Sequence, residues 1–266
     1  MPKHVFTTLD ALRGAAALLV VIYHAGTSRI PGGYLAVDMF FALSGFVLAY
    51  NYSGAISGLR DVVPFMRKRF VRLYPLYAVA LGVGFAVYLW TSLSGGTFWP
   101  TKAVATLAAN GMFLPAPPQL SLTWHLFPFN PPAWSLLFEM LVNLAFVLVL
   151  PFLGRRVLWA IIGIGAAMLA GSTLALGELD GGVRHTTWWA GATRVTFSFF
   201  AGVALYRFWT AGRLTLKLNP WVAAVALVGL LMVPAPDGWR IARDLTLVLV
   251  VLPLLIAAST RDAKSG

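Results

Sequence analysis

The sequence has few charged residues and no cysteine. Charged residues make up 11% of the 266 residues and hydrophobic residues 59%, whereas a soluble domain carries roughly 25% charged residues. So little charge cannot cover the surface of a globule of this size, which excludes a water-soluble protein. The lack of cysteine excludes disulfide frameworks, thiol catalysis and thiolate metal sites.

Acidic residues are also rare, with 9 Asp and Glu against 20 Lys and Arg and a net charge of +11. In so apolar a chain, the positive excess indicates contact with anionic lipid headgroups and cytoplasmic loops. No soluble module is present that could carry nucleic-acid binding. The four histidines are scattered without metal-ligand spacing, so no metal site is expected.

Nine apolar segments divide the chain, and a helical crossing of the bilayer takes roughly 20 apolar residues. The fold class predicted is all-α, a polytopic transmembrane helix bundle with about eight crossings and one partial or re-entrant segment. We expect one integral-membrane domain over residues 1–266. The segments are 11–28, 35–52, 74–93, 101–114, 133–153, 157–176, 188–209, 219–233 and 241–258.

The distribution of Lys and Arg predicts the orientation. The densest basic run, Arg60 to Arg72, separates the second and third segments, so that stretch and the N-terminus are expected inside. Segment 101–114 is short for a crossing. If it turns back, both termini are cytoplasmic and six basic residues return to the cytoplasmic side: Arg155, Arg156, Arg213, Lys217, Arg261 and Lys264. The Pro-rich stretch 115–132 is too apolar for a free linker and is expected to fold against the membrane face.

Two polar residues share one face of the first segment. Arg13 and His24 are eleven residues apart, close to three helical turns and roughly 16 Å along the axis. Charged groups inside a bilayer are costly and usually have a role. The alternative is a snorkelling arginine and a histidine satisfied by a main-chain carbonyl.

Two acidic residues lie in other apolar segments. Asp38 begins segment 35–52 and either partners His24 or caps its helix; Ser44-Gly45 follows as a patch where another backbone can approach closely. Glu139 lies about one turn into segment 133–153. Because its own segment offers no cation, we expect its partner on another helix, with His24 or Arg194 as the choices.

The basic run also carries a pair with the spacing of neighbours on a helix. Arg69 and Arg72 are three residues apart, and two guanidiniums placed so can fork onto phosphate oxygens. The alternative is that the two arginines bind no ligand and only contribute to the positive charge of the cytoplasmic side.

Together these residues resemble the membrane-bound acyltransferase family 3, whose members O-acylate glycans. The resemblance rests on Asp10, Arg13 and His24, on the block from Gly33 to Phe46, on Arg69 and Arg72 before Leu73-Tyr74-Pro75, and on Trp134-Ser135-Leu136 with Glu139. Beyond residue 140 it rests on Arg194 and Phe200-Ala201-Gly202. The family domain is usually longer, so we expect this chain to lack the last helices.

The resemblance implies an O-acyltransferase that moves an acyl group, acetyl being the expected one, from acyl-CoA to a hydroxyl of a carbohydrate or lipid-linked glycan. Acyl-CoA is then a donor substrate and not a permanent cofactor. It would meet Arg13, Arg69 and Arg72 with its phosphates and bring its thioester near His24. His24 would act as general base or carry the acyl group, with Glu139 or Asp38 orienting its ring. A multi-pass protein of the bacterial inner membrane is expected.

Two other classes stay open from the sequence. Intramembrane His, Glu, Asp and Arg also form the proton relays of secondary transporters and flippases, although no internal repeat supports that interpretation. A non-catalytic remnant of the acyltransferase scaffold is the second alternative, favoured by the expected lack of the last helices. Binding of CoA would separate the three classes.

Overall fold

The computed structural model describes residues 6–26, 30–56, 58–236 and 238–260, and over these ranges the chain is helical with no strand. It forms two compact units. Unit 1 comprises Met1–Ala55, Leu153–Asp180 and Thr193–Gly266, and unit 2 comprises Ile56–Phe152 and Gly181–Ala192. Both chain ends, which the sequence predicts to be cytoplasmic, lie outside the described residues.

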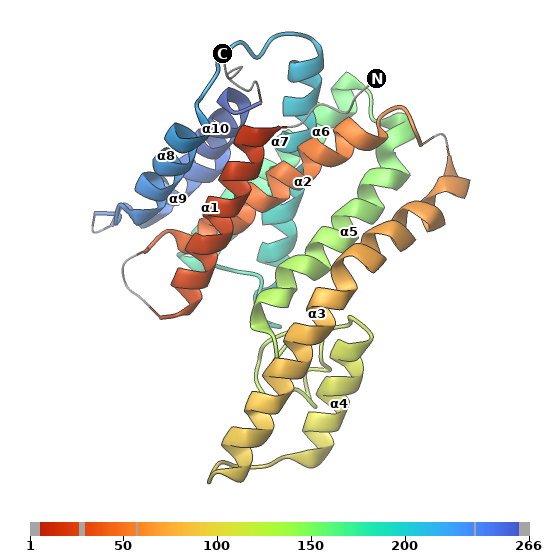
Figure 1. Cartoon of the computed structure of the whole chain (residues 1–266), viewed down its shortest axis with the longest axis vertical. Helices are drawn as coiled ribbons and strands as arrows, with labels where there is room; N and C mark the ends of the chain where they lie inside the picture. The colour runs from red at the N-terminus through yellow and green to blue at the C-terminus, as the bar shows by residue number, and fades with distance from the viewer. Residues whose placement is uncertain (1–5, 27–29, 57, 237, 261–266) are drawn as a thin grey trace. The chain divides into compact units, whose positions relative to one another are not determined.

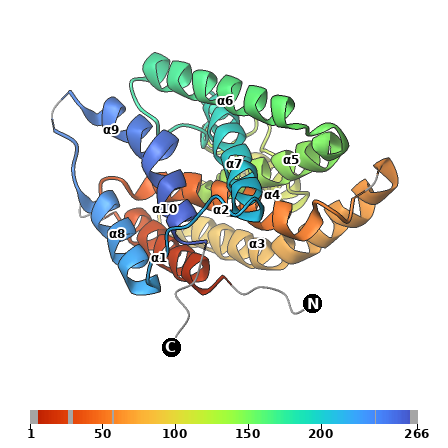
Figure 2. The ribbon, with the colours of Figure 1, turned by 90° about the horizontal axis from the view of Figure 1, so that it is seen from above.

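Unit 1 is a helix bundle built around α1 and α2. It contains α1 (Thr7–His24), α2 (Ala36–Tyr52), α6 (Arg155–Leu176), most of α7 (Trp188–Thr210), α8 (Pro220–Met232) and a last helical stretch of α9 (Arg240–Thr246), a π-helical turn (Leu247–Val251) and α10 (Leu252–Ala258). α1 packs against both α2 and α8, and α2 also contacts α10 (Figures 1 and 2). The apolar stripe Leu9, Leu12, Ala16 and Leu19 of α1 is buried in these contacts.

Two glycines let α2 and α7 approach within backbone contact. A Cβ added to Gly45 would lie 2.0 Å from the carbonyl oxygen of Phe199, and one added to Gly202 would lie 1.9 Å from that of Ala42. Any side chain here would collide with main-chain atoms, which cannot move aside as a flexible side chain can. The predicted close approach at Ser44-Gly45 is therefore confirmed.

Unit 2 consists of one long helix, two partners and a folded Pro-rich segment. α3 (Val62–Leu93) packs beside α5 (Trp134–Val149), and α4 (Pro100–Gly111) lies against α3 (Figure 1). Between α4 and α5 the backbone of Leu126 donates to Val183 at 2.9 Å and accepts from Ala116 at 2.8 Å. Phe127 is fully buried. The stretch 115–132 is thus a packed part of unit 2 and not a free linker.

Helix ends follow the local sequence. α4 and α8 each begin with proline, whose missing N–H is not needed in a first turn. Before α8, the side chain of Asn219 accepts a hydrogen bond from the backbone of Trp221 at 2.9 Å. α6 ends at Gly177, which adopts the left-handed conformation with φ of 74°.

All nine predicted segments form helices, with one large difference in extent. α3 begins at Val62, twelve residues before segment 74–93, so the basic run Arg60 to Arg72, read as a connecting stretch, is mostly helical. Apolar residues stand on both sides of its cations, and the run contains no glycine that would interrupt a helix. The first helix ends at His24, and residues 27 and 28 of segment 11–28 lie outside the described residues.

The number of crossings is only partly supported. In the described ranges, five helices are long and apolar enough to span a membrane: Gly33–Tyr52, Leu59–Leu93, Pro131–Phe152, Arg155–Leu176 and Arg240–Ala258. The predicted count of about eight is not confirmed. α4 has 12 residues, or about 18 Å at 1.5 Å per residue, well short of a bilayer core of about 30 Å.

Candidate active site

α1 carries the predicted base and one predicted phosphate ligand on an unbroken helix, so the spacing that puts Arg13 and His24 on one side holds. Arg13 pairs with Asp10 one turn earlier, Nη1 to Oδ1 at 2.8 Å, and both side chains remain well exposed. This i,i+3 pair lies at the half of α1 nearer the N-terminus, and His24 is the last residue of the helix.

The ring of His24 is held by its own helix. Its Nδ1 lies 2.8 Å from the carbonyl oxygen of Val20, and the ring of Tyr23 meets it edge to face with centroids 5.3 Å apart. Because a carbonyl can only accept, this contact puts the proton on Nδ1. In the neutral ring this tautomer leaves the lone pair on Nε2, the atom that a general base would use. This contact matches the alternative given for His24, a histidine satisfied by a main-chain carbonyl, which here orients the ring in place of the predicted Asp38 or Glu139.

Asp38 forms a buried ion pair that joins α2 to α7. Its Oδ2 accepts from Nη2 of Arg194 at 2.6 Å and from Nε at 3.2 Å, and Oδ1 accepts from Ser198 at 3.3 Å. Each side chain of the ion pair is 1% exposed. The structure gives Asp38 no side-chain cap bond to α2. Both carboxylate oxygens are engaged, so the expectation that Asp38 orients His24 is corrected: Asp38 neutralises a buried guanidinium.

In unit 2, Glu139 pairs with a residue that the sequence predicted to bind phosphate. Nη2 of Arg69 on α3 lies 2.9 Å from Oε1 of Glu139 on α5. The prediction that the partner comes from another helix is confirmed, but the choice between His24 and Arg194 missed Arg69. Arg69 lies on the side of α3 that faces α5, because the basic run is helical.

Arg69 and Arg72 therefore have different surroundings, which corrects the expected two-guanidinium fork. Arg69 is largely buried against Glu139. Arg72 is exposed and lines an open hollow of about 620 Å³ together with Arg67, Lys68 and the apolar residues Val63, Pro64 and Val71. Three cations therefore line this hollow, where they can meet an anionic ligand.

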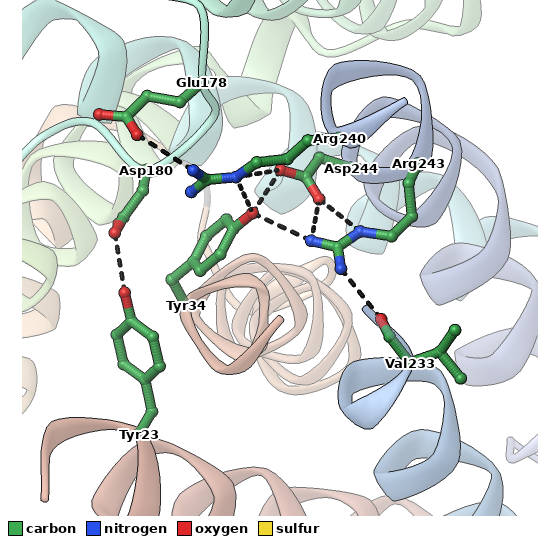
Figure 3. Close-up of polar contacts among 8 residues, drawn as sticks. All are labelled: Tyr23, Tyr34, Glu178, Asp180, Val233, Arg240, Arg243 and Asp244. Carbon is green, nitrogen blue, oxygen red and sulfur yellow. Dashed lines mark hydrogen bonds and ion pairs between the residues drawn. The ribbon is translucent and has the colours of Figure 1, made fainter. Parts of the chain in front are cut away.

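A second polar cluster occupies unit 1 and includes Tyr23, the residue before His24 (Figure 3). We call it the tyrosine–arginine cluster. Its centre is the hydroxyl of Tyr34, which donates to the fully buried Asp244 and lies 3.2 Å from Nη2 of Arg243. Arg243 also contacts Asp244 at 2.6 Å. The cluster consists of Tyr23, Tyr34, Glu178, Asp180, Arg240, Arg243 and Asp244.

The cluster reaches from the neighbour of His24 to the buried ion pair, because the rings of Tyr23 and Tyr34 lie 5.9 Å apart. Tyr23 donates to Asp180 at 2.9 Å, while the main-chain oxygen of Tyr34 accepts from Arg194 at 2.8 Å. Arg240 lies 3.6 Å from Glu178 and over the ring of Tyr34. Sequence reasoning missed this cluster. The signal was Asp244, an acid inside segment 241–258 of the same kind as Asp38 and Glu139.

Two histidines lie outside the candidate spans, in the loops of unit 2. Burial lowers the pKa of His125, and the nearby positive charge of Arg184 lowers it further. Burial also lowers the pKa of His185, partly offset by a hydrogen bond to the backbone of Ala116. Across the described ranges, no group of three or more His, Cys, Asp or Glu residues could hold a metal ion.

Comparison with known proteins supports the motif evidence. The model of the acyltransferase 3 domain matches residues 6–260. Protein 2 of the picA locus of Rhizobium radiobacter is 41% identical over 155 residues, covering 53% of this chain and 81% of that protein. Acyltransferase MdmB of Streptomyces mycarofaciens is 35% identical over 192 residues, covering 64% of this chain and 47% of that protein.

A protein of Staphylococcus aureus strain COL with O-acetyltransferase in its name is 36% identical over 81 residues, covering 28% of this chain and 13% of that protein. The chain thus spans less than half the length of the two relatives named for acyl or acetyl transfer. No solved structure matches. Because the family model covers nearly the whole sequence, the chain belongs to the acyltransferase 3 family of transferases.

Proposed function

We propose that this chain carries out membrane-embedded O-acyl transfer, moving an acyl group, acetyl in the first instance, from acyl-CoA to a hydroxyl of a carbohydrate or similar acceptor. Family membership supports acyl transfer. The O-acetyltransferase name of the Staphylococcus aureus relative supports oxygen as the acceptor atom. The observation that carries the proposal is the hydrogen bond between Nδ1 of His24 and Val20, which leaves Nε2 as a base.

The reaction needs one proton acceptor and one carbonyl electrophile. Nε2 of His24 takes the proton of the acceptor hydroxyl while the hydroxyl oxygen attacks the thioester carbonyl. A C–O bond forms, the C–S bond breaks, and CoA leaves as a thiolate that takes up the proton. In the covalent variant, Nε2 attacks the thioester carbonyl, the C–S bond breaks and CoA leaves as a thiolate. The acceptor oxygen then attacks the acyl-histidine, the C–N bond breaks to restore the imidazole, and the CoA thiolate takes up the hydroxyl proton. A general base contributes typically 10²–10⁴-fold to such a step.

The donor phosphates require cations. We assign them to the open hollow of Arg67, Lys68 and Arg72, where three cations surround a space with apolar walls. Arg13 is a further candidate, since its side chain is 39% exposed and its guanidinium has donors left beyond the bond to Asp10. Arg69 is better described as a positioning residue: with Glu139 it holds α3 against α5 and so fixes the orientation of the basic hollow.

The test is transfer of labelled acetyl from acetyl-CoA by the purified full chain in lipid nanodiscs. His24→Asn keeps an amide donor where Nδ1 stood but has no base, so we expect kcat to fall by about 10²–10⁴-fold. His125→Asn is the matched control and should leave kcat unchanged. Arg72→Gln should raise the KM for acetyl-CoA at nearly constant kcat, because it removes a binding charge and no reacting group.

The outcomes discriminate the alternatives. Rapid quenching that traps label on His24 would establish the covalent route, and its absence with normal turnover would favour direct transfer. Turnover of His24→Asn equal to that of the unaltered chain would refute the assignment of the base. Failure of the folded, unaltered chain to bind CoA would refute the donor assignment and leave the transporter or the non-catalytic scaffold.

A further inference from the structure

A second cationic hollow lies in unit 1, apart from every residue assigned above. It is formed where α6 begins and α7 ends, and it encloses about 220 Å³. Its walls include three arginines, two aromatic rings and one buried leucine. These residues are Arg155, Leu158, Trp159, Arg207, Phe208 and Arg213.

The hollow has positive charge without a matching acid. None of the residues that line it is acidic, and within the described part of the chain no ion pair involves Arg155, Arg207 or Arg213. Arg207 is held in place because it donates to the main-chain oxygen of Leu153. Arg155 is also the first residue of α6, where the helix dipole adds partial positive charge. Three guanidiniums around one space favour an anionic group that can accept several hydrogen bonds, such as a phosphate.

The hollow lies beside the first residue of one candidate membrane span, and the end of a span is expected near the lipid headgroups. Arg155 begins a candidate span, Arg155–Leu176, and Arg207 is in the last turn of α7. Trp159 is 46% exposed, and its ring lies 6.1 Å from that of Phe208. Tryptophan beside a ring of cations at the end of a span is typical of the membrane–water interface. A ligand here meets cations at one end and an apolar helix surface at the other.

We propose that this hollow binds the phosphate of an anionic phospholipid, with an acyl chain lying along α6 and α7. Its volume is below the roughly 300–1,000 Å³ of sites that enclose a drug-sized ligand, which favours a headgroup over a whole nucleotide. The proposal does not depend on acyl transfer, because none of its residues belongs to the proposed donor or base site.

The experiment measures binding of phosphatidylglycerol to the purified full chain in mixed micelles of a nonionic detergent, with phosphatidylcholine as the zwitterionic reference. The test variant is Arg155→Gln with Arg213→Gln, which spares Arg207 and its bond to Leu153. Each cation near an anionic lipid contributes about 1 kcal/mol, or about fivefold. We therefore expect phosphatidylglycerol to bind about 25-fold more weakly to the double variant, with phosphatidylcholine binding unchanged.

The matched control is Arg156→Gln with Lys217→Gln. It removes the same charge from the same two segments, but both residues are exposed and neither lines the hollow. The control variant should bind phosphatidylglycerol with an affinity within about twofold of the unaltered chain. It loses only long-range electrostatic attraction, which salt screens, and no contact in the hollow. Equal weakening in both double variants, or weakening in neither, would overturn the site. Displacement of phosphatidylglycerol from the unaltered chain by inorganic phosphate or CoA would overturn the lipid as its occupant.

Discussion

At the scale of single residues, the charges in this chain fall into two kinds. Arg194 and Asp38 are fully buried and neutralise each other, whereas Arg13 and Asp10 form an ion pair open to solvent. The sequence marked all four as important but could not tell these kinds apart. Which acid meets which base depends on packing between helices, not on spacing along one helix.

The two kinds of ion pair predict different costs for the same substitution. Asp38→Asn leaves Arg194 as an unpaired buried charge and should destabilise the fold by about 3–5 kcal/mol. Asp10→Asn, the matched control, should cost no more than about 1 kcal/mol because its pair is exposed. Thermal unfolding in detergent, followed by loss of helical circular dichroism, gives the comparison. Equal effects of the two substitutions would contradict the structural role of Asp38.

The loop histidines predict a pH dependence of stability. Because burial and Arg184 lower the pKa of His125, and burial lowers that of His185, the unfolded chain binds protons at these sites before the folded chain does. Stability is therefore fully present above the ordinary pKa of about 6.5 and falls as the pH drops below it. His125→Gln with His185→Gln should flatten this fall in melting temperature between about pH 6.5 and 5. If the melting temperatures of the variant and the unaltered chain fall in parallel with pH, the assignment of this pH dependence to the two histidines is refuted.

At the scale of helices, the close contact of α2 with α7 depends on two glycines, which have no side chain. Gly45 and Gly202 face carbonyl oxygens at distances that no Cβ can occupy. The sequence indicated the small patch at Ser44-Gly45, because small residues let helices approach. The sequence did not indicate that Gly202 takes part in the same contact, since Gly202 lies more than 150 residues away in the chain.

Adding one methyl group tests this contact. Gly45→Ala should lower stability by about 1–3 kcal/mol, because main-chain atoms of Phe199 must move. Gly163→Ala, on α6 with open space around its Cβ position, should be neutral or stabilise by up to about 1 kcal/mol through helix propensity. The measurement is the melting temperature of each variant in the same detergent, compared with that of the unaltered chain. If Gly45→Ala stabilises the protein, the close backbone approach of α2 and α7 at Gly45 is wrong.

At the scale of the whole molecule, membrane topology depends on α4. Its 12 residues are too few to cross, which supports the predicted partial or re-entrant segment. With such a segment, the loop before α6 is expected on the cytoplasmic side. A full crossing would instead put the loop before α6 outside. The two arrangements put Gly154 on opposite sides of the membrane. Both put Gly54 on the cytoplasmic side and Ser94 on the outer side.

The lack of native cysteine makes this difference easy to measure. Single variants Gly54→Cys, Ser94→Cys and Gly154→Cys all lie at exposed positions. With a membrane-impermeant maleimide on intact cells, we expect labelling of Ser94→Cys alone, and of the other two only after permeabilisation. Labelling of Gly154→Cys in intact cells would establish that α4 crosses the membrane.

The sequence by itself determined the class of protein, the helical segments and the family motifs. Scarce charge and long apolar runs allow few other arrangements, and spacing along one helix puts Arg13 and His24 on one side. Only the tertiary structure decided the partners: Arg69 for Glu139, Arg194 for Asp38, and Tyr34 for Asp244. Each of these contacts joins residues at least 70 positions apart. The physical reason is that a buried charge takes whichever opposite charge the packing of distant helices brings within a few ångström, and no local pattern encodes that choice.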